Sequence, residues 1–362
     1  MTGAPGGAPP AGIDADVLVI GAGPCGLAAA ISAQQAGLRA LVVDGSVVAS
    51  TITQYPTYVR FFSTAEKLSL GGMPFVVADE KPSRRDGLAY YRAVVQHFGI
   101  VVRQYEKVRA IEGTFGAFHV QTRTRAGEDR VIRAGAVVVA TGYFGSPNKL
   151  GVPGEDLPHV AHVYREGHEA FQQDVVVVGG GNSAAEAALD LWRAGARVTL
   201  VHFGPNFDKR IKPWVLPDFE NRVKEGSIAV RWNARVVAIE PHAVRVVPSG
   251  GTLRPVDGQA PTGAAESIPA SMVYVMTGFA PNLTLLRDAG VPIDPVTGIP
   301  THNPETLETS VPGLFIAGVV VAGFDANKVF IENGRYHGDR IVARLRGQNP
   351  PAAPKLSAEL DS

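Results

Sequence analysis

One local pattern occurs twice in the sequence, and it constrains the fold more than any other feature. In the first copy, the apolar, largely β-branched run at 16–20 predicts a buried strand. The glycine-rich turn at 21–26 (Gly-Ala-Gly-Pro-Cys-Gly) follows it, and a helix is expected over 27–36. Gly37 ends that helix, and the apolar run at 41–44 predicts the next strand.

The second copy follows the first at an offset of 158 residues. A strand is expected over 175–178, a glycine-rich turn over 179–184 and a helix over 185–194, which Gly195 ends before a strand at 198–202. Two copies in the same context and at a constant spacing indicate two Rossmann-like dinucleotide-binding units far more strongly than a single glycine motif would.

Each glycine of such a turn has a physical task. The first makes the tight turn, the second lets the backbone approach a pyrophosphate, and the third, or an alanine, lets helix and strand pack closely. The N–H groups at the start of the helix then face the phosphates. The candidates for phosphate contact are Gly21, Gly23, Pro24 and Gly26 in the first copy and Gly179, Gly181, Asn182 and Ser183 in the second.

The two copies differ where their second strands end, so we expect them to bind different nucleotides. Asp44 stands at that place in the first copy, where an acid hydrogen-bonds an adenosine ribose, and it suits FAD or NAD. His202 stands there in the second copy, so no carboxylate repels a 2′-phosphate. The cations Lys209, Arg210 and Lys212 follow closely, and the second copy therefore favours NADPH over NADH.

Composition excludes several other classes of protein. Lys+Arg and Asp+Glu both number 34, which argues against nucleic acid or anionic lipid as the main partner. The single cysteine, Cys25, excludes an intramolecular disulfide, a cysteine-cluster metal site and a CxxC redox pair. The histidines show no metal-binding spacing, and the apolar stretch at 17–33 is broken by glycine and proline. We expect no metal, no membrane span and a cytoplasmic location.

Two further strands end at glycine, and they indicate how the chain is organised. The run at 136–142 ends in Ala-Thr-Gly, which makes Thr141 and Gly142 candidate cofactor contacts, and the run at 313–318 ends at Gly318. With the turn at 21–26, these strand ends resemble those of the two-dinucleotide-binding flavoprotein superfamily. The resemblance implies an α/β fold of two Rossmann-like domains, in which an NADPH-binding domain is inserted into a split FAD-binding domain.

The expected domain bounds follow from the order of these motifs. The FAD-binding domain is expected over 14–160 and 268–346 and the NADPH-binding domain over 165–265. The Gly- and Pro-rich residues 1–13 are expected to be a disordered tail, and 347–362 a loose one.

Other stretches make the resemblance more specific. They are Gly-Pro-Cys-Gly at 23–26, Tyr-Pro-Thr at 55–57, Phe-Phe-Ser at 61–63, Glu-Lys-Leu at 66–68, Gly-Val-Pro-Gly-Glu at 151–155, Ile-Lys-Pro-Trp at 211–214 and Phe-Ile-Glu-Asn-Gly-Arg at 330–335. With them the chain resembles the bacillithiol disulfide reductase family, which are thioredoxin-reductase-like flavoenzymes without the CxxC. The resemblance implies FAD as prosthetic group, NADPH as reductant, a low-molecular-weight thiol disulfide as oxidant and Cys25 as the redox residue.

The resemblance also points to the C-terminal part of the chain. The strand before Gly318 continues with Val319, where the wider superfamily has an aspartate, so backbone N–H groups are expected to hold the flavin there. One helix is expected over 333–345. In related flavoproteins the start of this helix faces the flavin, which makes Asn333, Gly334 and Arg335 candidate contacts and His337 a candidate proton donor.

Several alternatives remain open at this point. Cys25 is either the redox residue or a small structural thiol, and Ser183 in the second copy shows that the turn does not require a cysteine. A ferredoxin- or flavodoxin-NADP reductase and an NADPH-sensing flavoprotein without catalysis are the competing functions. A flavin monooxygenase is disfavoured because its FxGxxxHxxx(W/F) segment is missing. A bacilliredoxin-like protein is a further candidate partner, and a homo-oligomer is expected.

Overall fold

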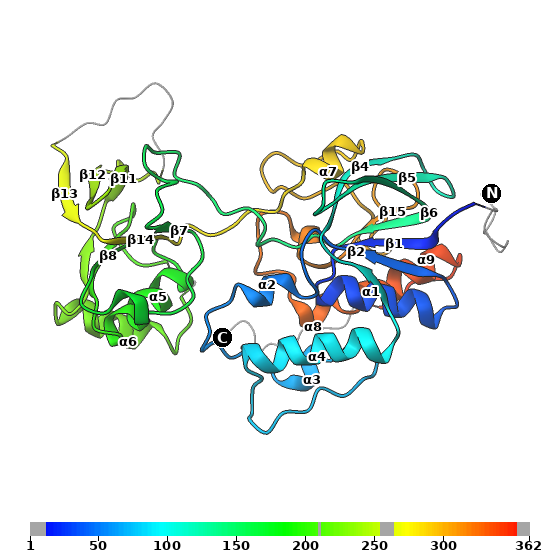
Figure 1. Ribbon diagram of the computed structural model, residues 1–362, viewed down its shortest axis with the longest axis horizontal. Coiled ribbons are helices and arrows are strands. Elements are labelled where there is room, and N and C mark those ends of the chain that lie inside the picture. The colour runs from blue at the N-terminus through cyan, green and yellow to red at the C-terminus, as the bar shows by residue number, and fades with distance from the viewer. Residues whose placement is uncertain (1–11, 209–210, 254–263, 353–362) are drawn as a thin grey trace. The chain divides into compact units, whose positions relative to one another are not determined.

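The computed structural model describes residues 12–208, 211–253 and 264–352. They form two compact units, drawn in Figure 1. Unit 1 takes its residues from Met1–Thr53, Val59–Ser146 and Ala280–Ser362, and unit 2 from Gln54–Tyr58 and Pro147–Phe279. The chain therefore passes between the units at four places, two of which flank the short segment 54–58.

Unit 1 is built on a seven-stranded sheet with the order β3-β2-β1-β6-β5-β4, to which β15 adds by pairing with β6. The strands are β1 (Ala15–Ile20), β2 (Ala40–Val43), β3 (Val101–Arg103), β4 (Glu106–Glu112), β5 (Phe118–Thr124), β6 (Asp129–Val139) and β15 (Leu314–Ile316). The pairs of β1 with β2 and β6, of β2 with β3 and of β15 with β6 are parallel. Continuous apolar runs such as Val-Leu-Val-Ile in β1 suit this position, because strands of a parallel sheet are buried on both faces.

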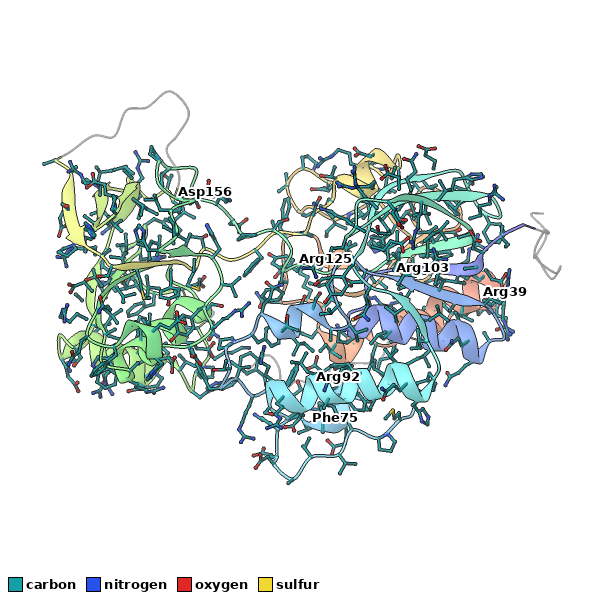
Figure 2. The ribbon with its side chains drawn as sticks, in the orientation of Figure 1. Arg39, Phe75, Arg92, Arg103, Arg125 and Asp156 are labelled. Atoms are coloured by element: carbon teal, nitrogen blue, oxygen red, sulfur yellow. The ribbon has the colours of Figure 1, made fainter. Side chains whose placement is uncertain are left out.

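The helices of unit 1 are α1 (Pro24–Gln35), α2 (Ser50–Thr53), α3 (Ala65–Leu68), α4 (Arg84–His97), α7 (Thr284–Asp288), α8 (Ile331–Gly334) and α9 (His337–Leu345). Helix α1 is rich in alanine and packs against α9. A Cβ atom at Gly338 of α9 would lie 2.6 Å from the Cα atom of Ala29, so glycine allows this close approach. Phe75, which is labelled in Figure 2, stacks on Tyr90 of α4 with ring centroids 4.1 Å apart.

Unit 2 is built on a five-stranded sheet with the order β10-β9-β8-β14-β7 and a separate three-stranded sheet, β11-β12-β13. The strands are β7 (Val160–Ala161), β8 (Asp174–Val178), β9 (Arg197–Val201), β10 (Ala229–Arg231), β11 (Ala234–Glu240), β12 (Ala243–Pro248), β13 (Glu266–Pro269) and β14 (Met272–Val275). Helices α5 (Asn182–Arg193) and α6 (Leu216–Lys224) complete it, and 3-10 turns occur at His168–Ala170 and, in unit 1, at Gly318–Ala322.

Strand β8 shows why the core of unit 2 has two parts. Val175 and Val177 belong to a cluster with α5 and α6, whereas Val176 and Val178 belong to a cluster with β11, β12 and β14. Successive side chains of a strand point to opposite faces, so one apolar run fills both clusters. Unit 1 has its own cluster, centred on β1, β5, β6 and β15.

The expected α/β fold with two Rossmann-like units is confirmed, and each expected element of the duplicated pattern lies within three residues of its position in the structure. Three details differ. The chain passes between the two units at 146/147 and 279/280, not near 160 and 268. The second of these boundaries lies after β14, because β14 pairs with β8 and belongs to unit 2. The segment 54–58 joins unit 2, and the expected helix over 333–345 is divided into α8 and α9.

The expected tails fall largely outside the described residues. The helices of the described part of the chain include none that is long and apolar enough to cross a membrane.

Candidate cofactor and redox site

The first glycine turn is held between the ends of three strands. A Cβ atom at Gly21 would lie 2.3 Å from the carbonyl oxygen of Ala140, and one at Gly26 would lie 2.0 Å from that of Gly21. Gly21 also has a φ of +113°, which disfavours any side chain. A Cβ atom at Gly23, in contrast, would meet nothing within 4 Å. Packing of the chain therefore requires Gly21 and Gly26, whereas Gly23 borders open space into which a cofactor can come close.

Helix α1 begins directly at this open space. Its N-cap is Gly23, no side chain caps it, and its first turn contains no acidic residue. The first N–H groups of a helix have no partner within the helix, and Pro24 at the first position has no N–H to satisfy. The N–H groups of Cys25 and Gly26 are thus suited to bind a phosphate. The residues fit a dinucleotide at this turn.

Asp44 follows β2 and reaches back to the same turn. Its two carboxylate oxygens accept hydrogen bonds from the backbone N–H groups of Ala22 and Ser46, each at 2.7 Å. Burial raises the pKa of Asp44, and the two backbone hydrogen bonds oppose this effect. Asp44 is half-buried. It therefore fixes the position of the turn, and the lone pairs that remain are free to accept from a ribose hydroxyl.

The other strand ends lie next to the turn, since β1, β6 and β15 are neighbours in the sheet. Thr141 is exposed just after β6, and Gly142 has a φ of +74° with no atom within 4 Å of an added Cβ. Gly318 follows β15, and its backbone N–H donates to Nδ1 of His337 at 3.1 Å. Backbone N–H groups at this strand end were expected to hold a flavin, and in the structure the N–H of Gly318 is engaged by His337.

Cys25 lies in contact with the C-terminal part of unit 1. A Cβ atom at Gly334 would lie 2.6 Å from the Cys25 Sγ atom, and one at Gly318 would lie 3.3 Å from it. Cys25 keeps partial solvent exposure, yet the surrounding atoms desolvate its thiol. This desolvation and the negative charge of Glu332 raise the pKa of Cys25 to about 12. The thiol, and not the thiolate, is therefore the resting form at neutral pH.

Glu332 is a part of this site to which the sequence analysis gave no role. It lies on α8, two residues before Gly334, and its Oε1 atom accepts a hydrogen bond from the hydroxyl of Ser63. Ser63 is buried, at 6% exposure. Both residues belong to motifs that carry the family resemblance, but only the fold brings the charge of Glu332 near Cys25 and the hydroxyl of Ser63 to Glu332.

Asn333 and Arg335 were expected to contact a flavin. In the structure both side chains form hydrogen bonds to other groups of the protein. Asn333 accepts from the N–H of Phe330 at 2.8 Å and donates to the carbonyl of Lys328, so it caps α8. The Arg335 guanidinium donates to the carbonyl oxygens of Glu66 and Ser69, both at 2.7 Å. These bonds hold the end of α8 and the end of α3 together.

The second glycine turn repeats the geometry of the first. A Cβ atom at Gly179 would lie 2.4 Å from the carbonyl oxygen of Met276, whereas one at Gly181 would meet nothing within 4 Å. Helix α5 begins without a side-chain cap. Asn182 accepts from the N–H of Lys212 at 3.1 Å, and Ser183 is exposed at the start of the helix. This turn also fits a dinucleotide phosphate.

His202, the expected nucleotide contact after β9, is buried at 8% exposure. A Cβ atom at Gly180 would lie 2.3 Å from its ring, so the imidazole packs directly under the turn. Burial lowers the pKa of His202, which is therefore neutral at neutral pH. No acid occupies this position, as expected, but the neutral imidazole of His202 offers no positive charge to a phosphate. Lys209 and Arg210 lie outside the described residues.

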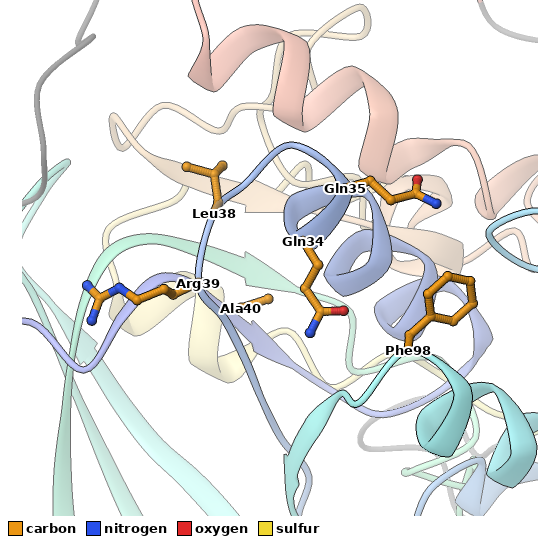
Figure 3. A pocket seen from close by; sticks show the side chains of 6 residues that line it. All are labelled: Gln34, Gln35, Leu38, Arg39, Ala40 and Phe98. Atoms are coloured by element: carbon orange, nitrogen blue, oxygen red, sulfur yellow. The ribbon is translucent and has the colours of Figure 1, made fainter.

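A shallow surface pocket lies at the far end of α1 (Figure 3). It is lined by Gln34, Gln35, Leu38, Arg39, Ala40 and Phe98. Arg39 is paired there with Asp16 at 2.9 Å. The lining includes none of the predicted site residues, and its place at the end of α1 opposite to the glycine turn separates it from the cofactor site.

With this geometry established, comparison with known proteins is decisive. A family model described as pyridine nucleotide-disulphide oxidoreductase matches residues 18–318. The chain belongs to this family. It is 42% identical over 334 residues to bacilliredoxin reductase Bdr of Bacillus subtilis (strain 168), a match that covers 92% of this chain and 98% of that protein.

Two solved structures agree with this result. The bacillithiol disulfide reductase Bdr (YpdA) from Bacillus cereus has a TM-score of 0.85 at 42% identity, covering 92% of this chain and 99% of that one. The enzyme of the same name from Staphylococcus aureus has a TM-score of 0.82 at 38% identity, covering 91% and 97%. The resemblance to the bacillithiol disulfide reductases is thus confirmed. As a pyridine nucleotide-disulphide oxidoreductase, the chain is an enzyme that uses a flavin and a pyridine nucleotide, as its two glycine turns indicate.

Proposed function

We propose that the protein is an FAD-dependent NADPH oxidoreductase that reduces a low-molecular-weight thiol disulfide of the bacillithiol disulfide type through Cys25. The observation that carries the proposal is the position of Cys25. It lies in the first turn of the helix that begins at the flavin-binding glycine turn, and its Sγ atom borders Gly318 and Gly334. A thiol at this place can exchange with a disulfide beside the cofactor.

The choice of FAD and NADPH rests on the two turns. Asp44 beside the first turn supports an adenosine ribose of FAD. We propose that Gly21, Gly23, Pro24 and Gly26 and the strand ends at Thr141 and Gly142 surround the FAD, and that Gly318 borders it without donating its N–H, which bonds to His337. The second turn lacks an acid at His202, which supports NADPH over NADH, with Gly181 and Ser183 at the phosphates. Bound together, the two groups supply a hydride donor and a two-electron carrier.

The chain's own chemistry is then a thiol–disulfide exchange. The Cys25 Sγ atom attacks one sulfur of the substrate, the substrate S–S bond breaks, and one thiol leaves while a mixed disulfide forms on Cys25. Because Cys25 is the only cysteine of the sequence, no second thiol of this chain can resolve that disulfide. Its reduction must therefore come from the cofactor.

The names of the similar proteins point to two candidate oxidants, a small disulfide and a bacilliredoxin-like protein. We favour the small disulfide because Cys25 is only partly exposed and lies among Gly318, Gly334 and Glu332. We further propose a homo-oligomer and a cytoplasmic site of action, where a lone thiol stays reduced.

The decisive experiment compares the parent enzyme with Cys25→Ser under anaerobic conditions. Reduction of the flavin by NADPH should be nearly unchanged and faster than with NADH, since Ser183 shows that a glycine turn accepts a hydroxyl here. Turnover with bacillithiol disulfide should fall by orders of magnitude. Equal turnover by the variant would reject the role of Cys25, and equal rates with NADH would reject the NADPH assignment.

One observation favours a second function. The raised pKa of Cys25, which reaches about 12, disfavours a thiolate nucleophile and suits a structural thiol. A ferredoxin- or flavodoxin-NADP reductase would need no thiol. If Cys25→Ser and the parent turn over ferredoxin at the same rate in this experiment, the result selects this alternative. If NADPH reduces the flavin but no oxidant supports turnover, the result selects an NADPH-sensing flavoprotein.

A further inference from the structure

We propose that Arg335 is a positioning residue, which holds α8 against α3 so that Gly334 covers the Cys25 thiol, and that this thiol reacts with a disulfide only when α8 moves away from it. The inference rests on the proposed function of Cys25 and adds the control of access to it. Arg335 was expected to contact a flavin, and its hydrogen bonds to α3 point to this different task.

The Cys25 sulfur is packed against two glycines of the C-terminal part of unit 1. A Cβ atom at Gly334 would lie 2.6 Å from Sγ, and one at Gly318 would lie 3.0 Å from the Cys25 Cβ atom and 3.3 Å from Sγ. The Cβ atom at Gly334 would also lie 3.5 Å from the Cα atom of Gly318, so the two glycines are close to each other. Helix α8 and the turn that begins at Gly318 therefore close two sides of the thiol.

A disulfide needs more room at this sulfur than the packing leaves. The two reacting sulfur atoms must first come within about 3–3.5 Å of each other, and the bond that forms between them is about 2.05 Å long. Since a methyl group does not fit between Gly334 and Sγ, a second sulfur has no room on this side. The surrounding atoms also desolvate the thiol. Access for a substrate therefore requires that a covering element moves.

Helix α8 is the covering element that is able to move. It is a single turn of four residues, and so short a helix is not stable without contacts to the rest of the fold. Gly318, in contrast, follows β15, which pairs with β6, and its N–H bonds to His337. The turn at Gly318 is therefore fixed to the sheet and to α9, whereas the position of α8 depends on the side-chain bonds that hold it.

The side chain of Arg335 ties the end of α8 to α3. Its guanidinium donates to the carbonyl oxygens of Glu66 and Ser69, both at 2.7 Å, and to the Ser69 hydroxyl at 3.1 Å. Hydrogen bonds from a charged donor are stronger than those between neutral groups. Because Arg335 directly follows Gly334 in the chain, these bonds fix the position of Gly334 on the Cys25 sulfur.

Two other side-chain bonds of α8 contribute less to this attachment. Asn333 bonds to Phe330 and Lys328, which belong to the same short segment as α8 itself. The Ser63 hydroxyl donates a single hydrogen bond to Glu332 from another part of unit 1. Arg335 is therefore the residue whose loss should release α8 most.

The test measures how fast iodoacetamide alkylates the holoenzyme with oxidised flavin. Because Cys25 is the only cysteine of the sequence, the S-alkyl adduct found by mass spectrometry reports on this thiol alone. In Arg335→Met, which removes the donors and keeps an apolar stem, we expect alkylation at pH 8 to be at least tenfold faster than in the parent. Arg335→Lys keeps a charged donor and should lie between the two. A rate in Arg335→Met equal to that of the parent, or lower, would reject the proposal.

The pH profile of the same reaction shows whether the thiol has become hydrated. Desolvation and the charge of Glu332 raise the pKa of Cys25 to about 12, so the alkylation rate of the parent should still rise about tenfold per pH unit near pH 10. Helix α1 and the turn at Gly318–Ala322 contain no charged residue, and His337 is neutral because burial lowers its pKa to about 4. In Arg335→Met the hydrated thiol should return toward its ordinary pKa, and the rate should level off above about pH 9. Identical profiles in the two proteins would contradict the proposal.

Urea distinguishes a local movement of α8 from general loss of stability. Movement of one short helix exposes little surface, so the alkylation rate of Arg335→Met should change little between zero and about 1 M urea. A steep rise would show that the thiol reacts through global unfolding, and the proposal would be rejected. The control is Arg92→Met, which removes an exposed arginine of α4 in unit 1 and should leave the rate of the parent unchanged.

Failure of the two proposals can be told apart, because alkylation does not require turnover. If Cys25→Ser abolishes turnover with bacillithiol disulfide but Arg335→Met is alkylated no faster than the parent, only the role of Arg335 is rejected. If Arg335→Met is alkylated faster but Cys25→Ser turns over as fast as the parent, Arg335 still covers the thiol and the redox role of Cys25 is rejected. Flavin content verifies that each variant is folded. Should Arg335→Met lose its flavin, Arg335→Lys decides, and a rate equal to that of the parent rejects the proposal.

Discussion

His337 begins α9 as a buried side chain, at 6% exposure, whose Nδ1 atom accepts the hydrogen bond from the N–H of Gly318. Burial lowers its pKa to about 4, and the nearby groups Arg340 and His302 act in the same direction. A neutral imidazole is what this hydrogen bond requires, because a protonated Nδ1 could not accept it. At neutral pH the ring therefore has no imidazolium proton to donate, which disfavours the expected role as proton donor.

We predict that His337 makes the stability of unit 1 depend on pH. Between pH 6.5 and 4 the unfolded chain binds a proton at His337 and the folded chain does not, so the free energy of unfolding is highest above pH 6.5 and falls toward pH 4. The loss amounts to about 3 kcal/mol. Denaturant unfolding, followed by flavin absorbance at several pH values, should show this decline in the parent and a smaller one in His337→Gln. Equal declines in both would contradict the prediction.

At the scale of elements, the two strand–turn–helix segments separate glycines that serve packing from glycines that serve a ligand. Gly21 and Gly26 lie against backbone carbonyls, as does Gly179 in the second copy. Gly23 and Gly181 border open space at the uncapped starts of α1 and α5. The same motif thus contains glycines that packing requires and glycines that leave room for a ligand, and a sequence pattern alone does not distinguish the two.

A pair of alanine substitutions tests this separation. Gly26→Ala should destabilise the protein by about 1–3 kcal/mol or more, because the new methyl group meets the Gly21 carbonyl oxygen. Gly23→Ala should leave stability nearly unchanged and weaken flavin retention by about tenfold or more, which is at least about 1.4 kcal/mol. Thermal unfolding and flavin titration measure the two effects. Unchanged flavin affinity in Gly23→Ala would show that the cofactor does not approach this glycine.

The elements of the duplicated pattern could be predicted because each depends on its own local sequence. The division of the last helix could not, since it depends on contacts between distant residues. The N–H of Tyr336 bonds to Asn333, three residues earlier, and the turn places the His337 ring on Gly318. Likewise, nothing local to Cys25 indicates the neighbouring Glu332, which lies 307 positions further along the chain.

At the scale of the whole molecule, the two units have separate apolar cores and separate spectroscopic signals. The core of unit 1 contains Phe118, and one cluster of unit 2 contains Phe219; both side chains are buried, at 1% and 0% exposure. All three tryptophans of the sequence, Trp192, Trp214 and Trp232, belong to unit 2, whereas the proposed flavin contacts belong to unit 1. Tryptophan fluorescence and flavin absorbance therefore report on different units.

We predict that core substitutions shift these signals independently. Phe219→Ala should lower the free energy of unfolding of unit 2 by about 3–5 kcal/mol and move the tryptophan transition to lower denaturant, with little change in flavin release. Phe118→Ala should do the reverse. Urea titrations read by both signals provide the measurement. Coincident shifts in either variant would show that the units unfold as one.

Because unit 2 lies between segments of unit 1 in the sequence, the two units are completed at different times during synthesis. Every residue of unit 2 has been made once Phe279 is added, so this unit can fold while synthesis continues. Unit 1 must wait, because β15 pairs with β6 and α9 packs on α1 only after the residues up to Leu345 have emerged. Gly318 and Gly334, which close the surroundings of Cys25, are among these late residues. A nascent chain can thus fold unit 2 early, but it completes the surroundings of Cys25 only after Gly334 has been made.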